Sequence, residues 1–180
     1  MAEWLGRALQ KLLHQFESGR DLLYNMTYKN VKLLVLDVDG TLTDGKVQYN
    51  SDGTKSRIFS IHDGYGLVKI MKKGIDVIVI TQSKCNSIEL RMNDLGIKLF
   101  QGIEDKLDVL KKYISMNQIK LSEVCYVGDD LNDYKILQSV GFPIAVNNSV
   151  SIIKEIASYV TKKKGGYGAV REVVDMLLNK

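Results

Sequence analysis

The chain has 180 residues, 45% of them hydrophobic and 26% charged, which suits one globular domain with a sizeable core. The net charge of +4 slightly favours small anionic ligands and is only weak evidence for nucleic-acid binding, for which no phosphate-binding glycine motif is present either. No apolar run approaches membrane-spanning length, no cleavable signal pattern opens the chain, and Cys85 and Cys125 form no disulfide framework. We therefore expect a cytoplasmic protein without a membrane span and without a nucleic-acid partner.

The first 30 residues precede the first predicted strand. Trp4, Leu9, Leu13 and Phe16 belong to an apolar stripe with helical spacing, and a polar linker follows it. The pattern predicts an amphipathic helix that packs on its own domain or on a partner subunit. Binding to a membrane surface is less favoured because the polar face is only modestly basic.

The strongest local signal is the apolar run Leu-Leu-Val-Leu at residues 33–36, which is too short for a helix and typical of a buried strand. Asp37 and Asp39 follow it immediately. Two carboxylates at the end of a buried strand are costly unless a cation lies between them. Ligands of open α/β sheets bind at the carboxyl ends of strands, so the pattern indicates a metal-assisted active site.

Residues 46–60 contain two β-like runs around Asp52-Gly53, which is a hairpin signal. The hairpin is either a small flap over the crevice or a plain structural element. The segment His-Asp-Gly-Tyr-Gly at residues 62–66 then precedes an apolar helical run at 67–71. Its glycines permit close approach of the backbone, and a helix beginning there offers its N-terminus to an anion.

The rest of the chain alternates between strand and helix patterns. Strands are expected at 76–80, 99–100, 124–127 and 142–146, and helices at 86–95, 106–115, 151–157 and 169–178. This alternation predicts an α/β fold with a doubly wound parallel sheet and right-handed connections.

Polar residues of a matching kind stand at the ends of the predicted strands or begin the helices that follow: Asp37, Asp39, Thr81, Lys106, Asp129 and Asp130. Each has an ordinary explanation by itself, such as a turn, a helix cap or a solvated lysine. Their common position at one edge of a parallel sheet predicts a single crevice instead.

These residues carry a family resemblance. DVDGT at 37–41, Thr81, Lys106 and GDDLND at 128–133 resemble the four motifs of the haloacid dehalogenase-like (HAD) phosphatases. DGTLTDG, the hairpin, HDGYG, LFQG, YVGDD and GGYGAVREV are similar to the 3-deoxy-D-manno-octulosonate 8-phosphate (KDO 8-phosphate) phosphatase branch. The resemblance implies a Rossmann-like HAD domain at 31–180, with a hairpin flap at 46–60 instead of a cap domain and a C-terminal tail at 161–180.

The resemblance also implies catalytic roles. Asp37 is the expected nucleophile, forming an aspartyl-phosphate, and Asp39 the general acid and then base, a role that calls for a raised pKa. Thr81 and Lys106 are expected to hold phosphoryl oxygens. Mg²⁺ is the expected cofactor, with Asp37, the Asp39 backbone carbonyl, Asp129 and Asp130 as its candidate ligands.

On the substrate side the resemblance points to a small sugar-acid phosphate, bound by residues drawn from His62, Asp63, Gly64, Ser83, Arg91, Lys106 and Tyr167. Relatives acting on the eight-carbon substrate typically have arginines where this chain has His62, Val68, Ser83 and Tyr167, and a valine or serine cannot replace the planar fork of arginine. KDO 8-phosphate, an intermediate of lipopolysaccharide sugar synthesis, is thus the first expectation. A nine-carbon 2-keto-3-deoxy acid 9-phosphate and a broad-specificity phosphatase are alternatives.

The resemblance to this branch also implies that the chain forms an oligomer. Its members form homotetramers in which the C-terminal tail of a neighbour helps to close each site. Phosphatase-like domains fused to sialic-acid-activating enzymes can serve mainly as oligomerisation modules, so a non-catalytic module is a further alternative. All four catalytic motifs are present here, which favours the enzyme.

Overall fold

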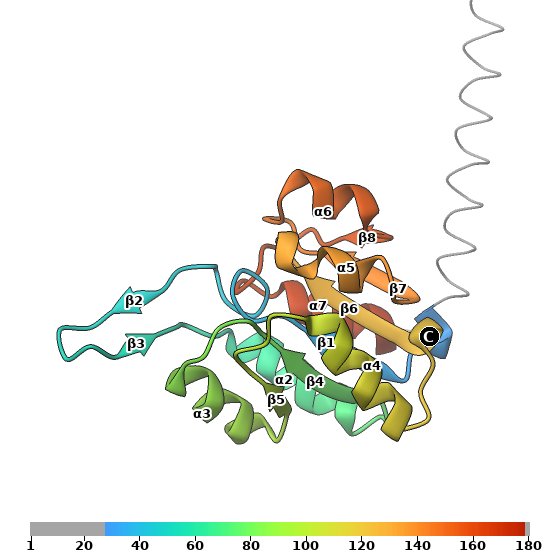
Figure 1. Ribbon diagram of the computed structural model, residues 1–180, viewed down its shortest axis with the longest axis horizontal. Helices are drawn as coiled ribbons and strands as arrows, with labels where there is room; N and C mark the ends of the chain where they lie inside the picture. The colour runs from blue at the N-terminus through green and yellow to red at the C-terminus, as the bar shows by residue number, and fades with distance from the viewer. Residues whose placement is uncertain (1–27, 179–180) are drawn as a thin grey trace, which may run out of the picture.

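The computed structural model describes residues 28–178, which form a parallel sheet covered by helices on both faces (Figure 1). The sheet has six strands in the order β5-β4-β1-β6-β7-β8. Their bounds are β1 Leu33–Leu36, β4 Asp76–Ile80, β5 Lys98–Phe100, β6 Val124–Gly128, β7 Phe142–Ala145 and β8 Tyr159–Val160. Every neighbouring pair in this sheet is parallel, which confirms the predicted doubly wound α/β architecture.

The helices follow the predicted alternation closely. They are α2 Ile61–Met71, α3 Asn86–Leu95, α4 Lys106–Met116, α5 Tyr134–Leu137, α6 Ser151–Ile156 and α7 Ala169–Leu178, with short 3₁₀ turns η1 Tyr28–Asn30, η2 Leu121–Glu123 and η3 Leu131–Asp133. Strand β8, the 3₁₀ turns and the single-turn helix α5 are additions that the sequence pattern did not predict.

Strand β1 lies at the centre of the sheet because all four of its side chains are apolar and fully buried. Leu34 and Leu36 pack with α2, α3 and α7 on one face, whereas Leu33 and Val35 pack with α4, α5 and α6 on the other. This alternation is the two-residue period of a strand covered on both faces. The register also places Leu36 beside Val79 of β4 and Val127 of β6, so the three central strands end together.

The predicted hairpin is present and extends away from the body of the domain (Figure 1). Strands β2 (Gln48–Tyr49) and β3 (Lys55–Ser56) pair antiparallel, and Gly53 takes the positive φ of 83° that the turn between them requires. Residues 46–60 are called the flap below. They form no cap domain.

Helix α2 begins earlier than predicted, so the glycine-rich segment 62–66 is helical rather than a loop. The Ser60 side chain caps the helix by accepting a hydrogen bond from the backbone N–H of Asp63 (3.3 Å). Close packing explains the glycine at position 66, because a Cβ there would lie 2.9 Å from Cδ of Arg171 on α7. The glycines thus permit two helices to approach closely, whereas the sequence pattern had placed the start of the helix after them.

Two further predictions concern the chain as a whole. The N-terminal amphipathic helix and most of its linker lie outside the described residues. Between residues 28 and 178, no helix is long and apolar enough to cross a membrane.

Candidate active site

The predicted crevice is found at the carboxyl edge of the central strands. A pocket of about 350 Å³ opens there, a size suited to a small phosphorylated ligand. It is lined by Asp37, Asp39, Gly45, Thr81, Gln82, Ser83, Asp129, Asp130 and Asn132. Residues from the ends of β1, β4 and β6 therefore meet as the strand pattern predicted.

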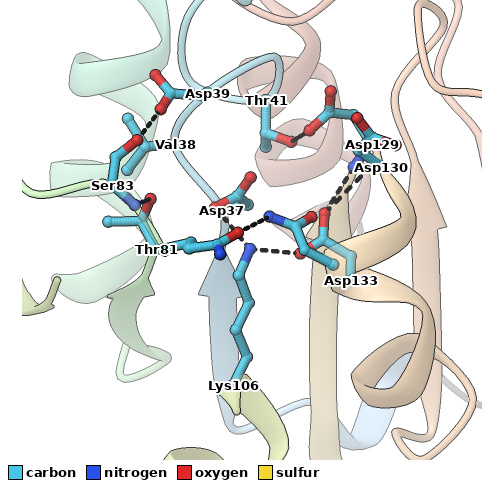
Figure 2. Close-up of polar contacts among 12 residues, drawn as sticks. Asp37, Val38, Asp39, Thr41, Thr81, Ser83, Lys106, Asp129, Asp130 and Asp133 are labelled. Carbon is cyan, nitrogen blue, oxygen red and sulfur yellow. Dashed lines mark hydrogen bonds and ion pairs between the residues drawn. The ribbon is translucent and has the colours of Figure 1, made fainter. Parts of the chain in front are cut away.

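A buried charge network forms the floor of the site (Figure 2). The Lys106 ammonium, at the start of α4, lies 2.8 Å from Oδ1 of Asp37 and 2.7 Å from Oδ1 of Asp133. The three side chains are 1%, 4% and 0% exposed. Burial by itself would lower the pKa of Lys106, but the two carboxylates outweigh it and raise that pKa, so the ammonium stays charged.

Asp133 is a site residue that the sequence reasoning missed. Its Oδ1 accepts a hydrogen bond from the Tyr126 hydroxyl (2.5 Å), and its Oδ2 accepts one from the backbone N–H of Asp129 (2.9 Å). Asp130, which the sequence favoured, is exposed, and its Oδ1 accepts from the backbone N–H of Leu131 (2.7 Å). The spacing of the aspartates in GDDLND could have identified Asp133, because the 3₁₀ turn at residues 131–133 returns the last aspartate of this motif to the strand end.

Three carboxylates concentrate negative charge at this edge. Asp37, Asp129 and Asp133 each offer an oxygen, and these atoms all lie within 4.8 Å of one another. Burial, followed by the charge of Asp133, raises the pKa of Asp37 to about 7. Burial, followed by the charges of Asp37 and Asp133, raises the pKa of Asp129 to about 8. A hard cation would relieve this repulsion, and the all-oxygen donor set fits Mg²⁺.

Asp39 lies apart from this network and points toward Ser83 (Figure 2). Arg57, on the flap, donates from Nε to Oδ1 of Asp39 (2.5 Å) and from Nη2 to Oδ2 (3.0 Å), and the Ser83 hydroxyl donates to Oδ2. Burial would raise the pKa of Asp39, but the hydrogen bonds from Arg57 and Ser83 outweigh it and hold the pKa below its ordinary value. The predicted raised pKa is therefore wrong for this arrangement, and the cause is an arginine that the sequence reasoning did not consider.

Thr81, which the sequence predicts to contact phosphate, lines the pocket. Its side chain is buried at the end of β4, beside Asp37 and Lys106 (Figure 2). The Thr81 hydroxyl oxygen accepts a hydrogen bond from the backbone N–H of Ser83 (3.2 Å), which leaves its O–H available to a ligand.

Of the predicted substrate-binding residues, only Ser83 lines this pocket; the others do not: His62, Asp63, Gly64, Arg91, Lys106 and Tyr167. The Asp63 carboxylate lies between α2 and α7, where its Oδ1 accepts from the backbone N–H of Arg171 (2.7 Å). Arg91 packs over Gly64, and His62 and Tyr167 are exposed. Their substrate roles stay predictions.

The chain is similar to several known proteins. A model of the haloacid dehalogenase-like hydrolases matches residues 98–173. The 3-deoxy-D-manno-octulosonate 8-phosphate phosphatase of Yersinia pestis is 39% identical over 150 residues, which cover 83% of this chain and 80% of that protein. The phosphatase of the same name from Escherichia coli K12 is 40% identical over 151 residues, with the same coverage.

A solved structure gives a further similarity. The 3-deoxy-D-manno-octulosonate 8-phosphate phosphatase of Moraxella catarrhalis, in complex with a magnesium ion, a phosphate ion and a KDO molecule, superposes with a TM-score of 0.85 at 39% sequence identity. The match covers 88% of this chain and 91% of that one.

Proposed function

Because this chain belongs to the HAD hydrolases, in the KDO 8-phosphate phosphatase branch, and is thus a phosphoric monoester hydrolase, we propose that it hydrolyses KDO 8-phosphate to KDO and phosphate. The reaction would serve lipopolysaccharide sugar synthesis in the cytoplasm. The observation that carries this proposal is the Asp37–Lys106–Asp133 network beside Asp129, beneath a pocket large enough for a small phosphorylated ligand.

In the first step, an Asp37 carboxylate oxygen attacks the phosphorus atom and the bond from phosphorus to the sugar oxygen breaks. Lys106 and the Thr81 hydroxyl face the transferring group and offset the charge of its oxygens. Asp39 is the proposed donor of a proton to the departing sugar oxygen, and it must first take up that proton, because Arg57 and Ser83 hold it as a carboxylate in the free chain. The products are the free sugar acid and an aspartyl-phosphate at Asp37.

In the second step, a water molecule attacks the phosphorus of the aspartyl-phosphate, and Asp39 takes its proton as a general base. The bond between phosphorus and the Asp37 oxygen breaks, and phosphate leaves. Lys106 stays charged throughout because Asp133, held by Tyr126, supplies a second negative partner when Asp37 is esterified.

Mg²⁺ fits the site as its cofactor, and it would shield the negative charge of Asp37 from that of the substrate phosphate. Asp37, Asp129 and the Asp39 backbone carbonyl are the proposed ligands, with Asp130 as the remaining candidate. The relative from Moraxella catarrhalis contains a magnesium ion, which supports this assignment.

Assembly into a homotetramer is part of the proposal. Two flap side chains, Tyr49 and Ile58, are apolar or aromatic and are 72% and 82% exposed in the single chain. Exposed apolar groups on one element favour contact with another subunit. Light scattering should give four times the chain mass, and a monomer at micromolar concentration would contradict this part.

Phosphate release with Mg²⁺, with and without EDTA, tests the function. The panel contains KDO 8-phosphate, nine-carbon 2-keto-3-deoxy acid 9-phosphates and simple sugar phosphates. A preference of at least about tenfold in kcat/KM for KDO 8-phosphate, lost in EDTA, is expected. Preference for a nine-carbon compound would contradict KDO 8-phosphate as the substrate and identify the nine-carbon acid phosphate instead. No release from any compound by the folded protein would favour the oligomerisation module.

A further inference from the structure

One accessible thiol lies where the flap meets the body of the domain. Cys85 is the N-cap residue of α3, and α3 packs against β3 of the flap (Figure 1). Cys85 is partly exposed, whereas Cys125 is fully buried in β6, and burial raises the pKa of the Cys125 thiol. Cys85 is therefore the cysteine that a small reagent can reach.

The Cys85 sulfur joins the flap to the start of α3. Its thiol donates a hydrogen bond to the backbone carbonyl of Lys55 on β3 (3.2 Å), and the sulfur lies 3.3 Å from the hydroxyl oxygen of Ser87. The backbone N–H of Cys85 donates to Oε1 of Gln101 (3.2 Å), which holds this part of the backbone in place. A chemical change at the sulfur would therefore act on a contact between the flap and the domain.

The groups around Cys85 favour its thiolate form. Burial would raise the pKa of the Cys85 thiol, but hydrogen bonds from the hydroxyl and the backbone N–H of Ser87, together with the charge of Arg57, outweigh it and lower that pKa. The sulfur also lies at the N-terminus of a helix of 10 residues, where the helix dipole stabilises negative charge. A thiolate is the reactive form of cysteine.

Three groups near the sulfur act in the opposite direction. The Lys55 carbonyl accepts a hydrogen bond only from the neutral thiol, although an S–H group is a weak donor. Asp39 offsets part of the charge of Arg57, and Glu89 lies in the first turn of α3. The lowered pKa of Cys85 shows that the stabilising contacts outweigh these effects.

The Arg57 side chain gives independent support, because it has a buried donor without an acceptor. It is only 4% exposed, and its Nε and Nη2 atoms donate to Asp39 and Ser83, whereas Nη1 is buried without a hydrogen-bond partner among the described residues. The hydrogen bond to Asp39 raises the pKa of Arg57 most, and Cys85 raises it further by its charge and by a hydrogen bond, so the guanidinium lies within reach of the sulfur. An unsatisfied buried donor destabilises the fold, and a Cys85 thiolate would supply the missing acceptor.

We propose that Cys85 is a modification site, at which a small disulfide such as oxidised glutathione forms a mixed disulfide that releases the flap from the loop at residues 81–85. The Cys85 thiolate attacks one sulfur of the reagent and the S–S bond of the reagent breaks. The second sulfur leaves as a thiolate, which takes a proton from water. A thiol reductant reverses the reaction by the same exchange.

The mixed disulfide acts on the flap in two ways. The sulfur no longer carries a proton, so its hydrogen bond to the Lys55 carbonyl is lost. The attached group must also find room beside a sulfur that has neighbours at 3.2 and 3.3 Å on β3 and α3. Ser83, two residues before Cys85, lines the pocket, so the displacement reaches the active site.

The pH profile of thiol reactivity tests the activation of Cys85. The full chain reacts with 2,2′-dithiodipyridine at a series of pH values, and a peptide of residues 82–88 serves as the unstructured reference. The pH midpoint reports the pKa of the thiol and the plateau rate reports access. We expect a lower midpoint in the native chain than in the peptide, and Arg57→Gln and Ser87→Ala should each move it back toward the peptide value.

A second experiment tests release of the flap. After treatment with oxidised glutathione, mass spectrometry should find the adduct on Cys85 and none on Cys125. Trypsin should then cleave after Lys55 and Arg57 at least about threefold faster, because local opening exposes the flap backbone. Dithiothreitol should restore the slower cleavage. Cys85→Ser keeps a donor for the Lys55 carbonyl, so its cleavage should not respond to oxidised glutathione.

Turnover gives a third readout, which rests on the proposed function. Release of phosphate by the modified wild type should fall by about tenfold or more and recover with dithiothreitol, because a small displacement of site residues is costly. No adduct at Cys85, unchanged trypsin cleavage, unchanged turnover of an active wild type, or a native midpoint at or above that of the peptide would overturn the inference. A wild type that releases no phosphate would overturn the proposed function alone, because the pH profile and the trypsin assay need no turnover.

Discussion

The replacement of Lys106 by Met tests the buried charge network directly. Methionine replaces the unbranched four-carbon stem of lysine and keeps the helix propensity of α4, but it removes the ammonium between Asp37 and Asp133. All three side chains are at most 4% exposed, so two carboxylates would remain buried without their cation. Removing one partner of a buried ion pair typically costs about 3–5 kcal/mol.

The assay is urea unfolding followed by linear extrapolation, with unchanged m-values as the sign that the two-state description holds. A loss of about 3–5 kcal/mol corresponds to about 6–20 °C in Tm for a domain of this size. Phosphate release should also fall, since Lys106 faces the transferring group.

Lys112→Met is the matched control on the same helix. Lys112 pairs with Asp108 at 2.7 Å, which equals the Lys106–Asp133 distance, but the Lys112 and Asp108 side chains are 69% and 53% exposed. Solvent screens such pairs, so no measurable change in stability is expected. A Lys106→Met loss below about 1 kcal/mol would refute the reasoning, because the site carboxylates would then be solvated or neutral in the folded chain.

Three further predictions concern the site and its support. Asp37→Asn should lower kcat by more than about 10⁴-fold while Tm stays near or above wild type, and retained turnover would exclude Asp37 as nucleophile. Tyr126→Phe removes a buried donor to Asp133 and should lower the free energy of unfolding by about 1–3 kcal/mol in urea titrations, whereas no loss would mean that this hydrogen bond is not formed. Burial raises the pKa of Asp63 against the hydrogen bonds from Arg171 and Gly168, so its charged form opposes folding. Asp63→Asn should therefore stabilise the fold above the folded-state pKa, with a benefit that disappears as the pH falls below the unfolded pKa; an equal effect at all pH values would contradict this sign.

Much of the site could be predicted because its residues stand beside strong local signals. The run at 33–36 predicted β1, and the parallel sheet then required Asp37, Thr81 and Asp129 to meet at one edge. The sequence could not show in this way whether Asp130 or Asp133 joins the buried charge network, because the answer depends on how one 3₁₀ turn returns to the strand end.

The N-terminal part of α2 shows the same limit. Gly64 and Gly66 weaken a helix pattern, and the chain alone offers no sign that α7 and Arg91 pack closely against them. Tertiary packing overrode the local preference, so residues 62–66 became helix. Asp63 then came to lie against the start of α7, outside the residues that line the pocket.

The sequence by itself determined which segments form buried strands, the doubly wound class of the fold and the presence of carboxylates at the strand ends. Each of these depends on a local pattern of apolar and polar residues that can be read along the chain. Only the tertiary structure decided the partners of those carboxylates. Arg57 and Asp39 are 18 residues apart, Lys106 and Asp133 are 27 apart, and Thr41 and Asp129, whose side chains hydrogen-bond at 3.4 Å, are 88 apart. Charge pairing over such separations depends on which side chains the packed sheet and flap bring together, and no local periodicity records it.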